Sequence, residues 1–210
     1  MKKFSVFLLS ILLVTLISGC NPPQPPQESL ILNGDFDNNT LDYWTTWHGS
    51  SVSDEWDINA DSGYIHWYRS VTSGSGGSVG AYQDINYDLT GKRVLFLSFD
   101  VRIHSQELGS DGWAGVGEYP AGVNIVFEDE FGNQYVYEKC FLKEGSPINY
   151  QENNVSLIPL DTWYQFEFDL MSDPDIASQI ASHPILKQIK VFGSGWSFEG
   201  GMDNIILLAH

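Results

Sequence analysis

The stretch LFLSFDVRI, at positions 95–103, decides the fold class of this chain. Its odd positions are all apolar, whereas Ser98, Asp100 and Arg102 stand at even positions. Successive side chains of a β-strand point to opposite faces, so this alternation is typical of a strand rather than a helix. It predicts a strand with one face in a core and the other face turned to water or a ligand.

This stretch is one of nine strand candidates along the chain. They cover residues 30–33, 64–70, 79–86, 94–104, 123–128, 134–142, 163–170, 186–192 and 202–208. Residues 129–133 are expected to form a hairpin turn, because Gly132 and Asn133 tolerate positive φ. The one helical stretch covers residues 175–182 and is closed by Pro184. Many short strands with almost no helix predict an all-β sandwich.

Composition narrows the function classes. The 210 residues include 10 Lys+Arg and 27 Asp+Glu, which gives a net charge of −17. So many carboxylates repel phosphate, and we therefore exclude nucleic acid as a partner. Hydrophobic residues make up 42% of the chain, an ordinary value for a globular protein, which excludes global disorder. The acidic balance favours neutral ligands or bound divalent cations.

The first residues have the pattern of a bacterial export signal. MKK at positions 1–3 is basic, and residues 4–17 form an apolar run that is shorter than the ~20 residues needed to span a bilayer. The run ends in LISGC at positions 16–20, which resembles the lipobox of bacterial lipoproteins. This resemblance implies a lipoprotein signal peptide over residues 1–19 and lipidation of Cys20. The alternative is an ordinary signal peptide with a chance cysteine.

A proline-rich linker follows the predicted anchor. Residues 20–28 contain Cys20 and four prolines, which form a semi-rigid polyproline spacer. Asn21 rather than Asp follows Cys20, which points to the outer membrane or cell surface of the bacterial envelope. With Cys20 acylated, Cys140 is left alone, so we expect no intramolecular disulfide and interpret Cys140 as a small buried hydrophobe. Residues 29–210 are predicted to form one domain.

Both ends of this domain resemble a known family. LILNGDFD at positions 30–37, LDYW at 41–44, DTW at 161–163 and GMDNIILL at 201–208 are similar to motifs of family 4/9-type carbohydrate-binding modules. Those modules belong to the galactose-binding-like jelly-roll group. The motifs bracket the domain, although residues 48–160 carry no signature of the family. The resemblance implies a jelly-roll β-sandwich whose first and last strands are neighbours, with Trp44 and Trp163 in the core.

The resemblance also implies a bound cation. In this family the positions of Asp37 and Asp203 hold a structural calcium ion, and Asp35 is close enough in sequence to contribute a carboxylate or carbonyl oxygen. Calcium takes six to eight oxygen ligands, and two neighbouring carboxylates need a cation to offset their repulsion. The family usually has Glu at the position of Asp37, so the reach of this ligand is shorter here. The alternative is a solvated acidic turn.

Exposed aromatic rings are the other expected feature of a sugar site, because pyranose rings stack on indole and phenol groups. We assign this role to aromatic residues in polar or glycine-rich segments, namely Trp47, Trp56, Trp113, Tyr119 and Trp196. The alternative is that these rings fold back onto the edge of the sandwich. Trp67 fits the core or a cleft equally well.

No pattern of catalytic residues accompanies these motifs. Glu128 and Glu130 are interpreted as a solvated hairpin end rather than a hydrolase pair, and the five histidines show no metal-binding spacing. We therefore predict a non-catalytic, monomeric, lipid-anchored module that binds an oligo- or polysaccharide and touches the membrane only through its lipid. The alternative is a structural or protein-interaction lipoprotein with the same sandwich and no sugar site. A glycoside hydrolase or lyase is the third and least favoured hypothesis.

Overall fold

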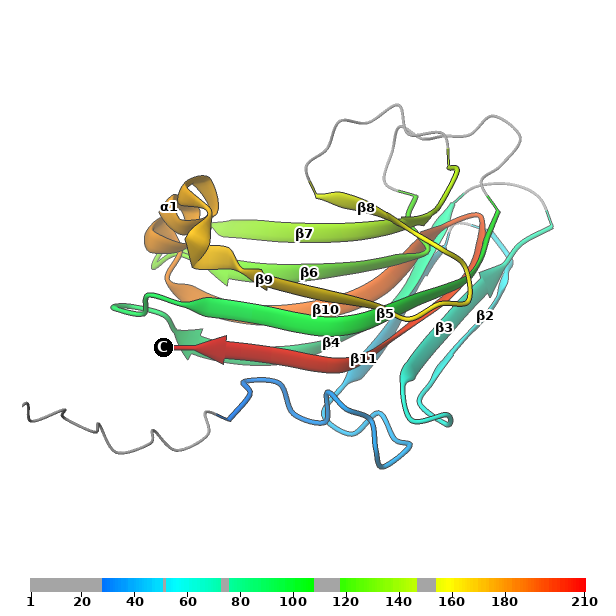
Figure 1. The fold of residues 1–210 in the computed structure, drawn as a ribbon, viewed down its shortest axis with the longest axis horizontal. Coiled ribbons are helices and arrows are strands. Elements are labelled where there is room, and N and C mark those ends of the chain that lie inside the picture. Colours follow the sequence, from blue (N-terminus) through cyan, green and yellow to red (C-terminus); the bar gives the residue numbers. More distant parts are fainter. Residues whose placement is uncertain (1–27, 51, 73–75, 108–117, 147–153) are drawn as a thin grey trace, which may run out of the picture.

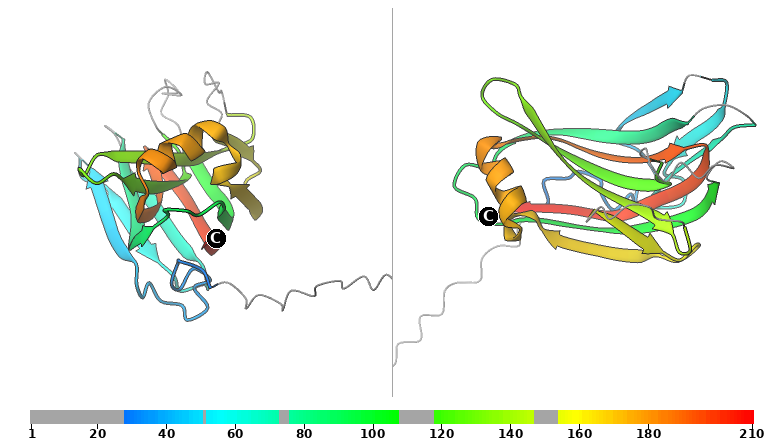
Figure 2. Two further views of the ribbon diagram at one scale, coloured as in Figure 1. Left: turned by 90° about the vertical axis from the view of Figure 1, so that its left-hand side faces the viewer. Right: turned by 90° about the horizontal axis from the view of Figure 1, so that it is seen from above.

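The computed structural model describes residues 28–210 except residue 51 and the segments 73–75, 108–117 and 147–153. The predicted signal peptide, Cys20 and Trp113 lie outside the described residues. The described chain forms two β-sheets that face each other, with the helix α1 at one end (Figures 1 and 2). Within this part of the chain, neither helical segment has the length and apolarity that crossing a membrane requires.

The two sheets differ in size but share one core. The six-stranded sheet has the order β1 (Thr45–Ser50), β4 (Gly77–Asp88), β10 (Ile185–Gly195), β6 (Ala121–Glu128), β7 (Gln134–Lys143) and β8 (Val155–Ile158). The five-stranded sheet has the order β2 (Glu55–Asn59), β3 (Ile65–Ser70), β11 (Ser197–Ala209), β5 (Leu95–Glu107) and β9 (Tyr164–Asp169). Neighbouring strands are antiparallel except β7 and β8, which are parallel. The predicted all-β jelly-roll sandwich with one short helix is confirmed.

The alternating stretch that decided the fold class lies in β5. Its apolar odd positions, Leu95 to Ile103, are almost completely buried. After Ile103 the register against β11 shifts, because Ile103 pairs with Gly200 and Ser105 pairs with Glu199. His104 is therefore the extra residue of a β-bulge, and the next buried position on the strand is Gln106. His104 follows the inward-facing Ile103 and therefore lies on the outer side of the sheet, as Arg102 does.

The helix is α1 (Pro174–Ser182), and it confirms the predicted helix at 175–182. Pro174 occupies the first turn, where its missing N–H costs nothing. The Asp173 carboxylate caps the helix by accepting hydrogen bonds from the main-chain N–H groups of Asp175 and Ile176, at 2.9 and 3.1 Å. The 3₁₀ turn η1 (Leu170–Ser172) connects β9 to this cap.

The two ends of the domain lie side by side, as the family resemblance implies. Leu30 N donates to Leu207 O and Ile205 N donates to Gly34 O, both at 2.8 Å. Figure 1 shows this N-terminal segment running along β11. The prediction of a strand at 30–33 is wrong, because φ is +50° at Asn33 and +48° at Phe36, which turns the chain away from a regular strand. Phe36 and Ile205 nevertheless bury their side chains in the same core.

Three strands and the positions of three tryptophans differ from the sequence-based expectation. β1, β2 and β8 were not predicted, and Trp47 and Trp56 lie in strands β1 and β2 rather than in a loop. Trp44 is a core residue as expected, and Trp67 is fully buried. Trp163 was expected in the core and is instead 39% exposed. It precedes edge strand β9, whose inward positions are taken by Phe166 and Phe168.

Candidate functional site

Chemically active side chains gather on the outer face of the five-stranded sheet. On β3, Ile65, Trp67 and Arg69 turn into the sandwich and are buried. The alternation of the strand therefore turns the residues between them outward, and the neighbouring strands β5 and β11 add side chains to the same side. The outer-face cluster consists of Tyr64, His66, Tyr68, Arg102, His104, Glu199 and the adjacent Asp161 and Trp163.

One half of this cluster is aromatic. The rings of Tyr64 and Trp163 meet edge to face, with centroids 5.2 Å apart and an interplanar angle of 89°. The Arg102 guanidinium carbon lies 5.0 Å from the Tyr64 centroid and 4.6 Å from the Trp163 centroid. Such cation–π contacts hold the rings in place. Arg102 Nε has no hydrogen-bond partner among the described residues. A fixed, partly exposed indole is thereby presented on the sheet surface.

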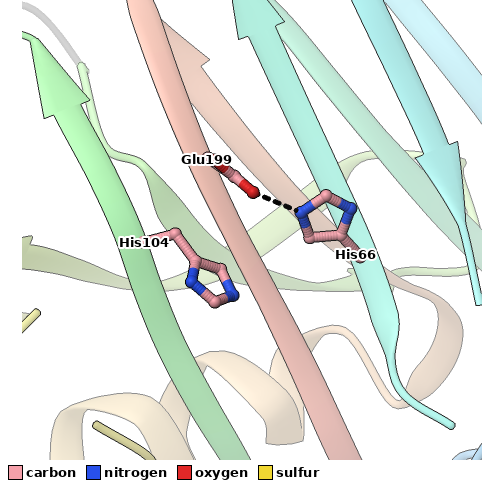
Figure 3. Close-up of side chains that lie close together, drawn as sticks. All are labelled: His66, His104 and Glu199. Carbon is pink, nitrogen blue, oxygen red and sulfur yellow. Dashed lines mark hydrogen bonds and ion pairs between the residues drawn. The ribbon is translucent and has the colours of Figure 1, made fainter. Parts of the chain in front are cut away.

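The other half consists of two histidine–carboxylate pairs. His66 Nε2 lies 2.9 Å from Glu199 Oε1, and His104 Nδ1 lies 2.8 Å from Asp161 Oδ1. The two imidazole rings meet edge to face, with centroids 5.9 Å apart and an interplanar angle of 74°. Figure 3 shows that His66, Glu199 and His104 come from three neighbouring strands. The Tyr64 hydroxyl, 3.5 Å from His104 Nε2, connects this half to the aromatic half.

A pocket of about 430 Å³ adjoins the cluster and shares Tyr68 and Glu199 with it. Its remaining lining comes from β3, β5, β11 and the segment after β3, namely Arg69, Ser70, Val71, Ser105, Glu107, Ser197 and Phe198. The pocket and the cluster together form one polar and aromatic surface. Its hydroxyl, carboxylate and imidazole groups provide both donors and acceptors of hydrogen bonds.

Four of the aromatic residues assigned from sequence lie within the described chain, on β1, on β2, before β6 and between β10 and β11. Trp56 is 41% exposed and stacks on His48, with centroids 4.5 Å apart. Trp47 is half-buried on β1, and its Nε1 finds no partner among the described residues. Tyr119 and Trp196 are also half-buried; Tyr119 exchanges hydrogen bonds with Ser194, and the Trp196 carbonyl accepts one from Arg69. No ring contact joins these four residues within the described chain, and Trp113 is outside it.

The acidic residues assigned to a cation do come together. Burial raises the pKa of the Asp203 carboxyl, and the charges of Asp100, Asp37 and Asp35 raise it further, against a lowering hydrogen bond from Asn204 N. Asp203 pairs with Asp100 across β11 and β5, and Asn204 Nδ2 donates to Asp100 Oδ2 at 2.8 Å. Asp203 from the last strand is therefore partly buried within reach of the charges of Asp100 and of the exposed Asp35 and Asp37.

Sequence reasoning missed the outer-face cluster. The alternation of Tyr64, His66 and Tyr68 was visible, but it does not say which face is outward. His66 and His104 are 38 positions apart, and β11, from the far end of the chain, lies between their strands. Only the strand order brings them together.

Comparisons with known proteins support the fold. No family model and no curated protein matches the sequence. Among solved structures, the chain is similar to the family 11 carbohydrate-binding module of the cellulosomal cellulase Lic26A-Cel5E of Clostridium thermocellum, with a TM-score of 0.50 and 16% identity over 88% of this chain and 95% of that one.

Two further solved structures show the same general likeness. One is the family 11 module from Clostridium thermocellum in complex with a β-1,3-1,4-mixed-linked tetrasaccharide, with a TM-score of 0.45 and 16% identity over 82% of this chain and 92% of that one. The other is a module described as CBM4, with a TM-score of 0.45 and 14% identity over 86% of this chain and 99% of that one. At these identities the likeness is one of fold, the β-sandwich of carbohydrate-binding modules.

Proposed function

We propose that the outer-face cluster binds an oligo- or polysaccharide without catalysing a reaction. The observation that carries this proposal is Trp163, a 39% exposed indole held by Tyr64 and Arg102 beside paired carboxylates and imidazoles. Ligand sites typically combine aromatic side chains with a few polar groups that fix the orientation of the ligand, and Trp163 has such groups beside it. The fold shared with a carbohydrate-binding module over nearly the whole of both chains supports the same reading.

The chemistry of the face suits a neutral sugar. The apolar side of a pyranose ring stacks on an indole or phenol, and its hydroxyls need both donors and acceptors at the rim. Arg102, His66 and His104 offer donors, and Glu199 and Asp161 offer acceptors. The net charge of −17 disfavours polyanionic glycans. A family 4/9-type relationship stays a prediction that rests on the end motifs.

A Trp163→Ala variant tests the proposed site. The purified protein is first screened on a glycan array, and the affinity for a positive glycan is then measured by calorimetry. We expect Trp163→Ala to weaken binding at least about tenfold, because truncating a central interface aromatic typically costs more than ~1.4 kcal/mol. Phe131→Ala is the matched control, since Phe131 is 81% exposed in the β6–β7 turn, away from the cluster.

Two outcomes contradict this site. Unchanged affinity in Trp163→Ala removes the outer-face cluster from the binding surface. If Trp56→Ala weakens glycan binding and Trp163→Ala does not, the sugar binds at Trp56, one of the residues assigned from the sequence, instead. The absence of any glycan hit favours the structural or protein-interaction lipoprotein with the same fold.

We also propose that Asp35, Asp37 and Asp203 hold a structural calcium ion. The donors are all oxygens, which calcium prefers, and the mutual repulsion of Asp203 with Asp100, Asp37 and Asp35 is what a divalent cation relieves. Lipidation of Cys20 and a location at the bacterial outer membrane or cell surface remain predictions from the sequence.

Calcium removal is expected to destabilise the protein. A ligand at 100 times its Kd adds ~2.7 kcal/mol of stability, which corresponds to roughly 5–10 °C in Tm for a domain of this size. We expect a chelator to lower Tm by this amount and excess Ca²⁺ to restore it, as measured by scanning calorimetry. Asp203→Asn should abolish the shift, and Asp61→Asn, at an exposed turn, should retain it. A Tm that does not respond to the chelator contradicts the calcium proposal.

A further inference from the structure

Three metal-binding side chains converge on the outer face of the five-stranded sheet. His66 from β3, Glu199 from β11 and His104 from β5 each offer one ligand atom, and these atoms all lie within 4.8 Å of one another (Figure 3). Each side chain remains accessible, with exposed fractions of 18% for His66, 41% for Glu199 and 21% for His104. An ion arriving from solvent therefore reaches all three.

The sheet itself creates the convergence. His66 and Arg102 both pair with Gly201 of the central strand, so the position between them carries no side chain. A Cβ on Gly201 would lie 2.7 Å from Ile65 O and from Tyr64 Cε2. His104 follows the inward-facing Ile103 on β5 and so lies on the same outer side as Arg102. Backbone hydrogen bonds of three strands, rather than a flexible loop, hold the three ligands.

The ligand chemistry selects the class of ion. Two imidazoles and one carboxylate match the preference of Zn²⁺, whose Zn–N and Zn–O bonds of about 2.0–2.2 Å place tetrahedral donors about 3.3 Å apart. His66 Nε2 and Glu199 Oε1 are 2.9 Å apart, close to this spacing. Calcium, with its demand for six to eight oxygens, does not suit these groups.

A second carboxylate orients one of the ligands. Asp161 Oδ1 lies 2.8 Å from His104 Nδ1, which leaves His104 Nε2 for the shared space. Metal-binding histidines typically engage a carboxylate in this way through the nitrogen that does not bind the metal. The Tyr64 hydroxyl, 3.5 Å from His104 Nε2, is the nearest neutral oxygen. Arg102 is the cation on this face, and its guanidinium is held against the Trp163 and Tyr64 rings.

We infer that His66, His104 and Glu199 bind a divalent transition-metal ion of the Zn²⁺ type, with Asp161 as the positioning residue of His104. Three protein ligands leave a fourth coordination position for water or for a ligand on the same face. This site is separate from the proposed calcium ligands Asp35, Asp37 and Asp203 and does not depend on the proposed glycan binding.

The test is a metal titration of the tag-free protein after treatment with a chelating resin. Calorimetry is expected to show one equivalent of Zn²⁺ bound, and Co²⁺ in its place should give the visible absorption bands of a tetrahedral site. We expect His66→Gln or His104→Ala to weaken Zn²⁺ binding by about 100-fold or more, and Asp161→Asn by about 10–100-fold with a shifted Co²⁺ spectrum. His183→Ala, at the end of α1, is the control and should bind as the parent does.

Circular dichroism and Tm of each variant show whether it has folded. The inference is overturned if the folded parent binds no Zn²⁺, or if folded His66→Gln and His104→Ala variants both retain the parental affinity. An equal loss in His183→Ala also overturns it. Because the metal alone is the probe, this result is independent of any glycan measurement.

Discussion

An Arg69→Met variant is expected to lose about 3–5 kcal/mol of unfolding free energy, the usual cost of removing one partner from a buried ion pair. Arg69 has a fully buried side chain, and the Asp54 side chain paired with it is only 4% exposed. Its Nη1 donates to the main-chain carbonyls of Gly195 and Trp196, both at 2.6 Å, and its Nη2 donates to Ser50 Oγ at 3.1 Å. Arg69 thus ties β3 to the end of β1 and to the β10–β11 turn.

The expected loss of unfolding free energy is large because the Asp54 carboxylate stays buried after Arg69 is removed. Burial on its own raises the pKa of Asp54, but hydrogen bonds from His48, Arg69 and Ser50 hold the pKa below its usual value. Methionine fills similar volume but leaves the buried Asp54 carboxylate with His48 and Ser50 and no arginine partner, and it removes the Arg69 donor from two carbonyls. Urea unfolding at neutral pH measures the loss, which corresponds to roughly 6–20 °C in Tm.

Two further variants separate the effect of the Arg69 charge from the effect of its hydrogen-bonding geometry. Arg69→Lys keeps the charge without the planar fork, so we expect an intermediate loss. The double variant Arg69→Met/Asp54→Asn should be more stable than Arg69→Met alone, because it removes the unpaired buried charge. A loss below about 1 kcal/mol in Arg69→Met would show that this end of the sandwich does not depend on the ion pair.

The core of the fold was predictable because period-two alternation is a local signal. The stretch at 95–103 and the segments that became β3 and β9 carry it. β1 and β2 do not, because both are edge strands with mostly exposed or half-buried residues. A strand with no fully buried face leaves no apolar period in the sequence.

The candidate site was less predictable because non-local register creates it. Glu199 meets His66 only because β11, from the end of the chain, inserts between β3 and β5. His104 lies on the outer side by the alternation of β5, but only the strand order brings it near His66. Trp163 was assigned to the core from its motif, but edge strand β9 packs the half-buried Phe166 and Phe168 against the core and leaves Trp163 39% exposed. The acidic residues at the chain ends were locatable, since the end motifs imply neighbouring termini.

Tyr64 connects the two halves of the outer-face cluster. Its ring meets Trp163 and Arg102, and its hydroxyl approaches His104 Nε2 at 3.5 Å. An ion bound by His66, His104 and Glu199 would therefore lie beside the proposed sugar platform. Glycan affinity measured with and without Zn²⁺ shows whether an ion at the metal site changes sugar binding at Trp163. Trp163 is not a metal ligand in this arrangement.

The placement of the site depends in turn on a buried residue. Trp67 is fully buried, and its Nε1 donates to Pro120 O at 2.9 Å. The indole fits because Gly193 and Gly200 face it, and a Cβ on Gly193 would lie 2.7 Å from Trp67 Nε1. With Trp67 pointing inward, its neighbours His66 and Tyr68 must point outward. The core thus determines which side of β3 carries the functional groups.

Trp67→Ala is accordingly expected to cost about 3–5 kcal/mol, from the lost burial of the indole and the cavity that remains. Trp67→Phe retains most of the volume and loses the hydrogen bond to Pro120 O, so it should cost about 1–3 kcal/mol. Both losses are measured by denaturant unfolding. Folded Trp67→Phe should bind Zn²⁺ and glycan like the parent, because Trp67 does not reach the outer face. A loss below about 1.5 kcal/mol in Trp67→Ala, or equal losses in the two variants, would contradict the role of the indole as the packing residue that sets the orientation of β3.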